Sequence, residues 1–83
     1  MNIINDIPKL KQIDRLLRHA ATGSPKEFAE KMNVSRATIF RIIALLKEEF
    51  NAPIHFDRGL NSYCYKYHGK IVMQWIEEKL DTE

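Results

Sequence analysis

A group of hydroxyl and guanidinium side chains lies near the middle of the sequence, where Ser35-Arg36-Ala37-Thr38 is followed by Arg41. Arginine forms bidentate hydrogen bonds with phosphates and with guanine edges, and the serine and threonine hydroxyls add further donors. The free N–H groups in the first turn of a helix also bind anions, and the helix dipole favours negative charge there. If a helix begins at this point, the residues predict a binding site for a polyanion.

Two helices joined by a tight turn are predicted to position this group. The first begins at Ser24, which can cap it, with Pro25 at the first helical position and Glu27 completing a capping box. Asn33 follows about two turns later and tolerates a positive φ better than most residues. A short helix packed across a longer one is typical of a protein that presents a helix to the DNA major groove.

The longer helix is expected to run from about Arg36 to Phe50. Its predicted core stripe has apolar residues at intervals of four, three and four, namely Ile39, Ile43, Leu46 and Phe50. Phe40 and Ile42 are further apolar positions outside this stripe. Because they favour a protein partner whereas Arg36 and Arg41 favour DNA, the pattern alone leaves both open.

Further elements are predicted on both sides of this pair. Before it, apolar residues spaced by three and four predict a helix that is capped by Asp6, is ended by Thr22 and Gly23, and carries Asp14 on its mostly charged outer face. After it, residues 54–57 and 63–67 each alternate in polarity around a short Gly/Asn segment, which predicts a β-hairpin. Its apolar face is expected to hold Ile54, Phe56, Tyr63 and Tyr65.

The end of the sequence predicts one more helix, because residues 70–81 show an amphipathic pattern. Trp75 and Ile76 lie on its apolar side, and core packing or dimerisation would bury them. We therefore expect a domain over residues 1–69 and a C-terminal amphipathic helix over 70–83, packed on the domain or at a dimer interface.

The order of helix, short helix, turn, long helix and hairpin is that of a winged helix-turn-helix domain. The sequence SPKEFAEKMNVSRATIFRIIALL resembles the DeoR-like and related winged-helix families of bacterial regulators, through Glu27-Phe28-Ala29-Glu30, Val34-Ser35, Thr38-Ile39 and Arg41. Residues 52–58 and Tyr63-Cys64-Tyr65 resemble the wing of that group. The resemblance covers about residues 7–67 and departs from the family pattern at Asn33, Ile42 and Ser62. It implies a mainly α fold with a small β-hairpin, in which a three-helix core carries a β-wing and an extra C-terminal helix.

The resemblance also implies sequence-specific binding of double-stranded DNA by a small bacterial transcriptional regulator. The helix over 36–50 would enter the major groove, and the hairpin over 54–67 would act as the wing. The residues predicted to contact DNA are Ser24, Ser35, Arg36, Ala37, Thr38, Phe40, Arg41, Lys47, Arg58 and Asn61. A homodimer on two half-sites is expected, with the C-terminal helix as the candidate contact, and no small-molecule effector domain is expected in a chain of this length.

Composition and charge agree with this class. Residues 1–70 hold twelve Lys/Arg against seven Asp/Glu, a charge of +5, whereas residues 71–83 carry −3. A basic body favours a polyanionic partner. The lone cysteine, Cys64, excludes an internal disulfide, and neither a signal peptide nor an apolar run of about 18 residues is present, so a cytoplasmic protein without a membrane partner is expected.

Other classes of function have weaker support in the sequence. A winged-helix module that binds protein without DNA is the main alternative. An enzyme is not expected, because the chain has no Gly-rich phosphate loop and no paired-carboxylate or nucleophile arrangement. The spacing of His19, His55, His68 and Cys64 matches no zinc motif, so neither a metal nor a cofactor is predicted. A stripe of tyrosines at 63, 65 and 67 is expected to be a buried hairpin face rather than a base-stacking surface.

Overall fold

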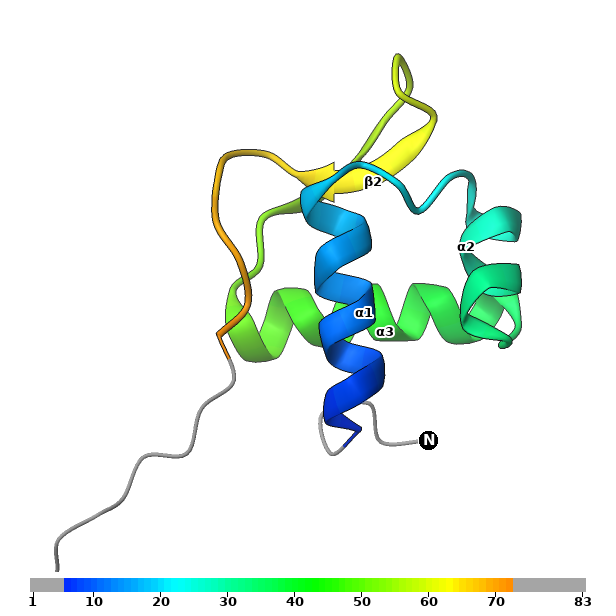
Figure 1. Ribbon diagram of the computed structural model, residues 1–83, viewed down its shortest axis with the longest axis horizontal. Helices are drawn as coiled ribbons and strands as arrows, with labels where there is room; N and C mark the ends of the chain where they lie inside the picture. The colour runs from blue at the N-terminus through cyan, green and yellow to red at the C-terminus, as the bar shows by residue number, and fades with distance from the viewer. Residues whose placement is uncertain (1–5, 73–83) are drawn as a thin grey trace, which may run out of the picture.

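Three helices are followed by a β-hairpin in the computed structural model, which describes residues 6–72. The elements are α1 (Ile7–Arg18), α2 (Pro25–Met32), α3 (Arg36–Phe50), β1 (Ile54–Asp57) and β2 (Ser62–Tyr65). In Figure 1, α1 runs across α3, and α2 lies beside the N-terminal end of α3. The predicted mainly helical fold with an antiparallel hairpin is confirmed, and the arrangement is consistent with a winged helix-turn-helix. Within residues 6–72 no helix is long and apolar enough to cross a membrane.

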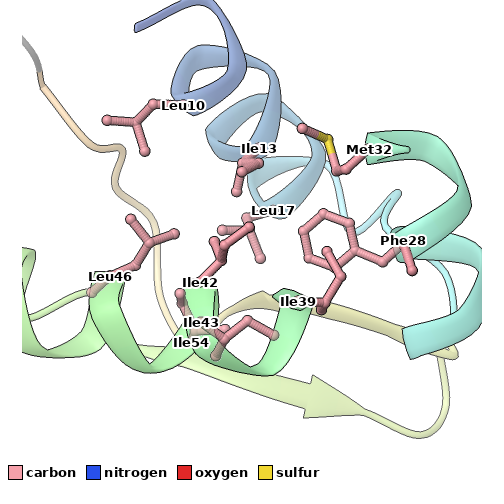
Figure 2. Close-up of a cluster of buried hydrophobic side chains, with 12 residues drawn as sticks. Leu10, Ile13, Leu17, Phe28, Met32, Ile39, Ile42, Ile43, Leu46 and Ile54 are labelled. Atoms are coloured by element: carbon pink, nitrogen blue, oxygen red, sulfur yellow. The ribbon is translucent and has the colours of Figure 1, made fainter. Parts of the chain in front are cut away.

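The hydrophobic core lies where the three helices meet the first strand, as Figure 2 shows. Its main members are Leu10, Ile13, Leu17, Phe28, Met32, Ile39, Ile42, Ile43, Leu46 and Ile54. The inward positions of α3 are thus 39, 42, 43 and 46, a broader stripe than the sequence pattern indicated, because α1, α2 and the hairpin cover it from several sides. Ile42 is only 5% exposed and belongs to the core, whereas Phe40 is 52% exposed. Of these two apolar residues of α3, Phe40 alone therefore lies on the surface and remains to be explained.

The end of α1 differs from the prediction that Gly23 caps it. The helix stops at Arg18, and Ala20 adopts a φ of 51°. The Ala21 N–H donates to the Leu16 carbonyl and the Ala20 N–H to that of Leu17, which is the Schellman arrangement with alanine where glycine is usual. The prediction was wrong because it placed the left-handed residue at the nearest glycine.

Gly23 has a positive φ of 73°, but it introduces α2 rather than ending α1. A Cβ at this position would lie 2.6 Å from Glu27 Oε1, so the close approach of the capping box requires glycine. The predicted capping box is confirmed: Ser24 Oγ accepts from the Glu27 N–H at 3.2 Å, and the Ser24 N–H donates to Glu27 Oε1 at 2.8 Å. The hydrogen bond from the Ser24 backbone is the main reason that the pKa of the Glu27 carboxyl is lowered.

The turn between α2 and α3 depends on Asn33, which has a φ of 57° as predicted. The Val34 N–H donates to the Ala29 carbonyl at 3.0 Å and closes the end of α2. Ser35 then returns to extended geometry and caps α3. Three residues therefore reverse the chain and set α3 across α2.

The hairpin pairs Ile54 with Tyr65 and Phe56 with Tyr63, so the predicted apolar face is confirmed. The Phe56 and Tyr63 rings meet edge to face with centroids 5.0 Å apart, and the Phe28 ring lies 6.0 Å from that of Tyr63. Tyr67 is 69% exposed and lies beyond the strand, so the predicted burial of all three tyrosines was wrong at this position.

Asp14 is buried at 6% exposure, contrary to its predicted place on the outer face of α1. Its Oδ1 accepts from the Tyr65 hydroxyl at 2.6 Å and from the Ile71 N–H at 2.9 Å, and its Oδ2 accepts from Arg18 Nε at 3.1 Å. The helical pattern could not show this, because the strand and the segment that cover Asp14 are more than 50 residues away in sequence. One carboxylate thus joins α1, β2 and the segment after the hairpin.

Ser62 and Thr22 form a second buried polar contact, at 1% and 0% exposure. Ser62 Oγ accepts from the N–H groups of Thr22 and Gly23 at 3.0 and 3.3 Å, while Thr22 Oγ1 accepts from the Tyr63 N–H at 2.9 Å. The two hydroxyl oxygens lie 2.9 Å apart. Hydrogen bonds therefore hold the loop between α1 and α2 against the start of β2.

The predicted C-terminal helix falls almost entirely outside the described residues, and so do Trp75 and Ile76. Its first residues, 70–72, have no regular secondary structure. Ile71 packs against the core instead.

Candidate nucleic-acid interface

The first turn of α3 is capped by Ser35, which leaves some of its backbone N–H groups without an acceptor. Ser35 Oγ accepts from the Thr38 N–H at 3.1 Å and lies 3.0 Å from Thr38 Oγ1. The N–H groups of Arg36 and Ala37 belong to the first turn, where the helix itself offers no acceptor. Two hydroxyls and two backbone donors therefore gather at the positive end of the helix dipole, an arrangement suited to an anionic oxygen.

One face of α3 is exposed along its length, opposite the buried stripe. The structure brings together on this face the exposed side chains of Arg36, Ala37, Phe40, Arg41, Ala44 and Lys47, and the exposed Glu48 follows one turn after Ala44. Five of these six were predicted as contact residues from the sequence, and Ala44 is the addition. The face combines cations, one large apolar ring and two small side chains that leave the helix backbone accessible.

The charge on this face is not neutralised by any ion pair among residues 6–72. In the part of the chain that the structure describes, the one ion pair joins Arg18 to Asp14 on α1. Arg36, Arg41 and Lys47 consequently have no carboxylate within salt-bridge distance in residues 6–72. The first turn of α3 has no acidic residue, and the glutamates at 48 and 49 lie near its C-terminal end. The positive potential is therefore concentrated toward the N-terminal part of the helix.

Ser24 lies apart from this face, at the start of α2. It is half-buried, and its hydroxyl oxygen accepts from the Glu27 N–H. The hydroxyl hydrogen can still be donated, so that Ser24 resembles Ser35 as a capped helix start with room for an acceptor.

Arg58 and Asn61 are both exposed on the turn between β1 and β2. Asp57 Oδ1 accepts from the Leu60 N–H at 3.1 Å, and Asn61 adopts a φ of 51°, which together shape the turn. Leu60 is 60% exposed at this turn and was not among the predicted contacts. In Figure 1 the turn projects from the helices, away from α3. Apart from Ser24, the predicted residues therefore lie on two separate surfaces, one on α3 and one on the hairpin.

The residues that orient the second surface were missed by the sequence analysis. Asp14, Thr22 and Ser62 hold the hairpin on the helices, yet none has a local pattern that predicts a tertiary contact. Ser62 had a weak signal, because serine stands there in place of the glycine that the family resemblance favours. Its buried hydroxyl now gives that difference a structural reason.

The comparisons with known proteins agree with this geometry. The profile of the family described as "HTH domain" matches residues 9–63, more than half of the chain. The matched span contains all but the first two residues of α1, the whole of α2, α3 and β1, the turn, and the start of β2. No curated protein and no solved structure gives a significant match.

Proposed function

The chain belongs to the HTH domain family, and we propose that it binds specific double-stranded DNA sequences as a small transcriptional regulator of the DeoR-like bacterial type. The observation that carries the proposal is the exposed face of α3, whose three cations have no acidic partner within residues 6–72. A surface of this kind attracts phosphates and releases counterions when it binds them.

In this proposal the N-terminal half of α3 enters the major groove. Arg36 and Arg41 extend from the exposed face to guanine edges or to phosphates, and Ala37 allows close approach and contact with a thymine methyl group. Phe40 packs on the sugar–phosphate backbone. The first-turn N–H groups of α3 bind a phosphate and fix the depth of insertion.

The hairpin supplies the second contact. Arg58 inserts into a narrow minor groove, where A·T-rich sequences concentrate negative potential, and Asn61 donates to the adjacent backbone. Because the turn lies apart from α3, the two surfaces contact different parts of the duplex. Lys47 and Lys66, both exposed, add phosphate contacts without sequence preference.

A single domain of this size contacts few base pairs, so we propose that two copies bind an inverted repeat. The dimer contact is assigned to the segment with Trp75 and Ile76. Sedimentation with and without DNA tests this assignment, and a monomer in both cases would contradict it.

Selection of bound sequences from a random DNA pool tests the proposed function directly. We expect an enriched inverted repeat with half-sites one helical turn apart, about 10 base pairs between centres. Enrichment of a single specific site without an inverted repeat would support DNA binding and would reject the dimer. Failure to enrich any sequence, together with no gel-shift complex at low salt, would reject DNA binding.

Charge-matched variants locate the contact surface. Arg36→Ala and Arg41→Ala should each weaken specific binding by about 1–3 kcal/mol, roughly 5- to 150-fold, because each removes a potential bidentate base contact. Arg15→Ala removes the same charge from an exposed position on α1 and should change affinity far less. Circular dichroism checks that all three variants fold. Equal losses in the three variants would mean that only net charge matters.

Protein binding without DNA is the second candidate, favoured by the 52% exposure of Phe40 in the middle of the basic face. Phe40→Ala separates the two functions. If α3 contacts DNA, the variant should weaken the complex detectably; if the face serves a protein partner alone, neither it nor Arg36→Ala should change DNA affinity.

A further inference from the structure

Three side chains with metal-binding atoms lie together on the hairpin. His55 and Asp57 belong to β1, and Cys64 belongs to β2. The strand register pairs His55 with Cys64, and Asp57 lies two residues from His55, so that all three project from the same side of the sheet. One ligand atom from each lies within 4.8 Å of the other two.

We propose that His55, Asp57 and Cys64 bind a divalent metal ion of the zinc type. Zinc lies about 2.3 Å from a cysteine sulfur and about 2.0–2.1 Å from a histidine nitrogen, and tetrahedral angles then separate the two atoms by roughly 3.5 Å. Cys64 Sγ and His55 Nε2 are 3.4 Å apart. The thiol and imidazole ligand atoms therefore already lie at about the distance that a shared zinc ion requires.

The chemistry of the donor set agrees with this ion. Thiolate and imidazole are the ligands that select zinc among the common biological divalent ions. A thiolate, a carboxylate and a neutral imidazole carry a total charge of −2, which a divalent cation balances. Cys64 is 8% exposed and the other two ligands are half-buried, so the ligand side chains would separate the ion from much of the surrounding water.

Asp57 completes the set of three ligands. Its Oδ1 accepts from the Leu60 N–H at 3.1 Å, the kind of outer hydrogen bond that orients metal-ligating carboxylates. The second oxygen remains available to the ion. Three protein ligands leave a fourth tetrahedral position for a water molecule.

This site differs from the sequence-based expectation that no metal binds. That expectation treated the histidines and Cys64 as members of different elements with no zinc spacing. The structure places His55 and Cys64 opposite each other on two paired strands, whereas His19 and His68 are not members of the group. Cross-strand ligands follow the register of the sheet, so a search for short sequence motifs does not find them.

The ion would link the two strands next to the turn that carries Arg58. A two-stranded hairpin is marginally stable by itself, and a ligand that binds only the folded chain adds stability by mass action. Metal binding is thus expected to order the wing without entering the helical core.

Titration of the reduced, metal-free full chain with Co²⁺ alone tests the site. We expect one equivalent to bind with the intense near-ultraviolet absorption of a cobalt–thiolate bond, and Zn²⁺ to displace it. Cys64→Ser should abolish this absorption, and His55→Ala or Asp57→Asn should weaken binding at least about tenfold. His68→Ala, which changes an exposed histidine outside the group, should bind as the wild type does.

Thermal unfolding with and without Zn²⁺ provides the second measurement. The melting temperature of the wild type and of His68→Ala should rise with zinc, and that of Asp57→Asn should rise less. Asp57→Asn preserves side-chain size, so it keeps the test valid if Cys64→Ser fails to fold. The absence of cobalt–thiolate absorption in the folded wild type, or its loss in His68→Ala, would overturn the proposal. Neither result depends on DNA, so the proposed function is tested separately.

Discussion

The helix α3 and the hairpin are held on the molecule by different forces. α3 is attached by buried apolar side chains, among them Ile39 and Leu46, both 0% exposed. The hairpin also buries Ile54, but it is further joined to the helices and their loop by hydrogen bonds of Asp14 and Ser62 to partners 39 to 51 positions away. Apolar burial tolerates small shifts, whereas buried hydrogen bonds require both partners in place. The orientation of α3 should therefore be less sensitive than that of the hairpin to single polar substitutions.

Ile39→Ala should have the largest effect, because it removes a fully buried side chain beneath the exposed face of α3. We expect a loss of about 2–5 kcal/mol in the free energy of unfolding, measured by urea denaturation. A loss of this size is a large fraction of the stability of a small domain, so both surfaces would be lost together. Phe40→Ala, on the opposite face, is the control, and an equal loss there would contradict the assigned orientation of α3.

Asp14→Ala should cause the second largest loss of stability. It leaves the Tyr65 hydroxyl and the Ile71 N–H without their acceptor, at about 1–3 kcal/mol for an unsatisfied buried group. Hydrogen exchange should accelerate in β2 more than in α3. Asp14→Asn keeps the size and one acceptor oxygen, so it should lose less. Uniform acceleration across both regions would show that the hairpin and the helices unfold as one unit.

Ser62→Ala should destabilise the protein by about 1–2 kcal/mol, because the Thr22 and Gly23 N–H groups lose their common acceptor. Thr22→Val removes the acceptor for the Tyr63 N–H with little change in volume. The two hydroxyls share one contact, so the double variant should be non-additive by about 0.5–3 kcal/mol. Additive losses would mean that the two bonds act independently.

Alkaline pH should weaken the hairpin attachment through Tyr65. Burial raises the pKa of its phenol, and the hydrogen bond to Asp14 raises it further. The folded state therefore keeps a proton that the unfolded chain releases near pH 10, so the stabilisation is complete below about pH 10 and declines above it. Urea denaturation of the wild type and of Tyr65→Phe, at pH 8 and at higher pH, measures this. A stability difference between them that does not change with pH would contradict the role of the phenol.

Arg58→Ala should have the smallest effect, confined to DNA binding. If the turn contacts a phosphate or a minor groove, affinity should fall modestly and the slope of log K against log salt should decrease in magnitude by about one. Arg58→Lys keeps the charge and should restore the slope. An unchanged slope in Arg58→Ala, measured by titration at several salt concentrations, would remove the turn from the interface.

Local features were predictable from sequence wherever the interactions that stabilise them join residues close together in the chain. The capping box at Ser24 and Glu27 and the left-handed Asn33 need only neighbouring residues, and the alternating pattern identified both strands. The exposure of the basic residues of α3 was predictable too, because helical periodicity alone separates them from the apolar stripe. Ile42 was misassigned because a helical pattern does not show how many neighbours will cover the helix.

The sequence by itself determined the helices, the hairpin and the chemical character of the face that α3 presents, since periodicity, capping and charge act over a few residues. Only the tertiary structure decided the burial of Asp14, the bonding of Ser62 to Thr22 and the meeting of His55, Asp57 and Cys64. Each of these depends on which distant segments become neighbours. That choice is made by the packing of the whole core, which no short segment specifies.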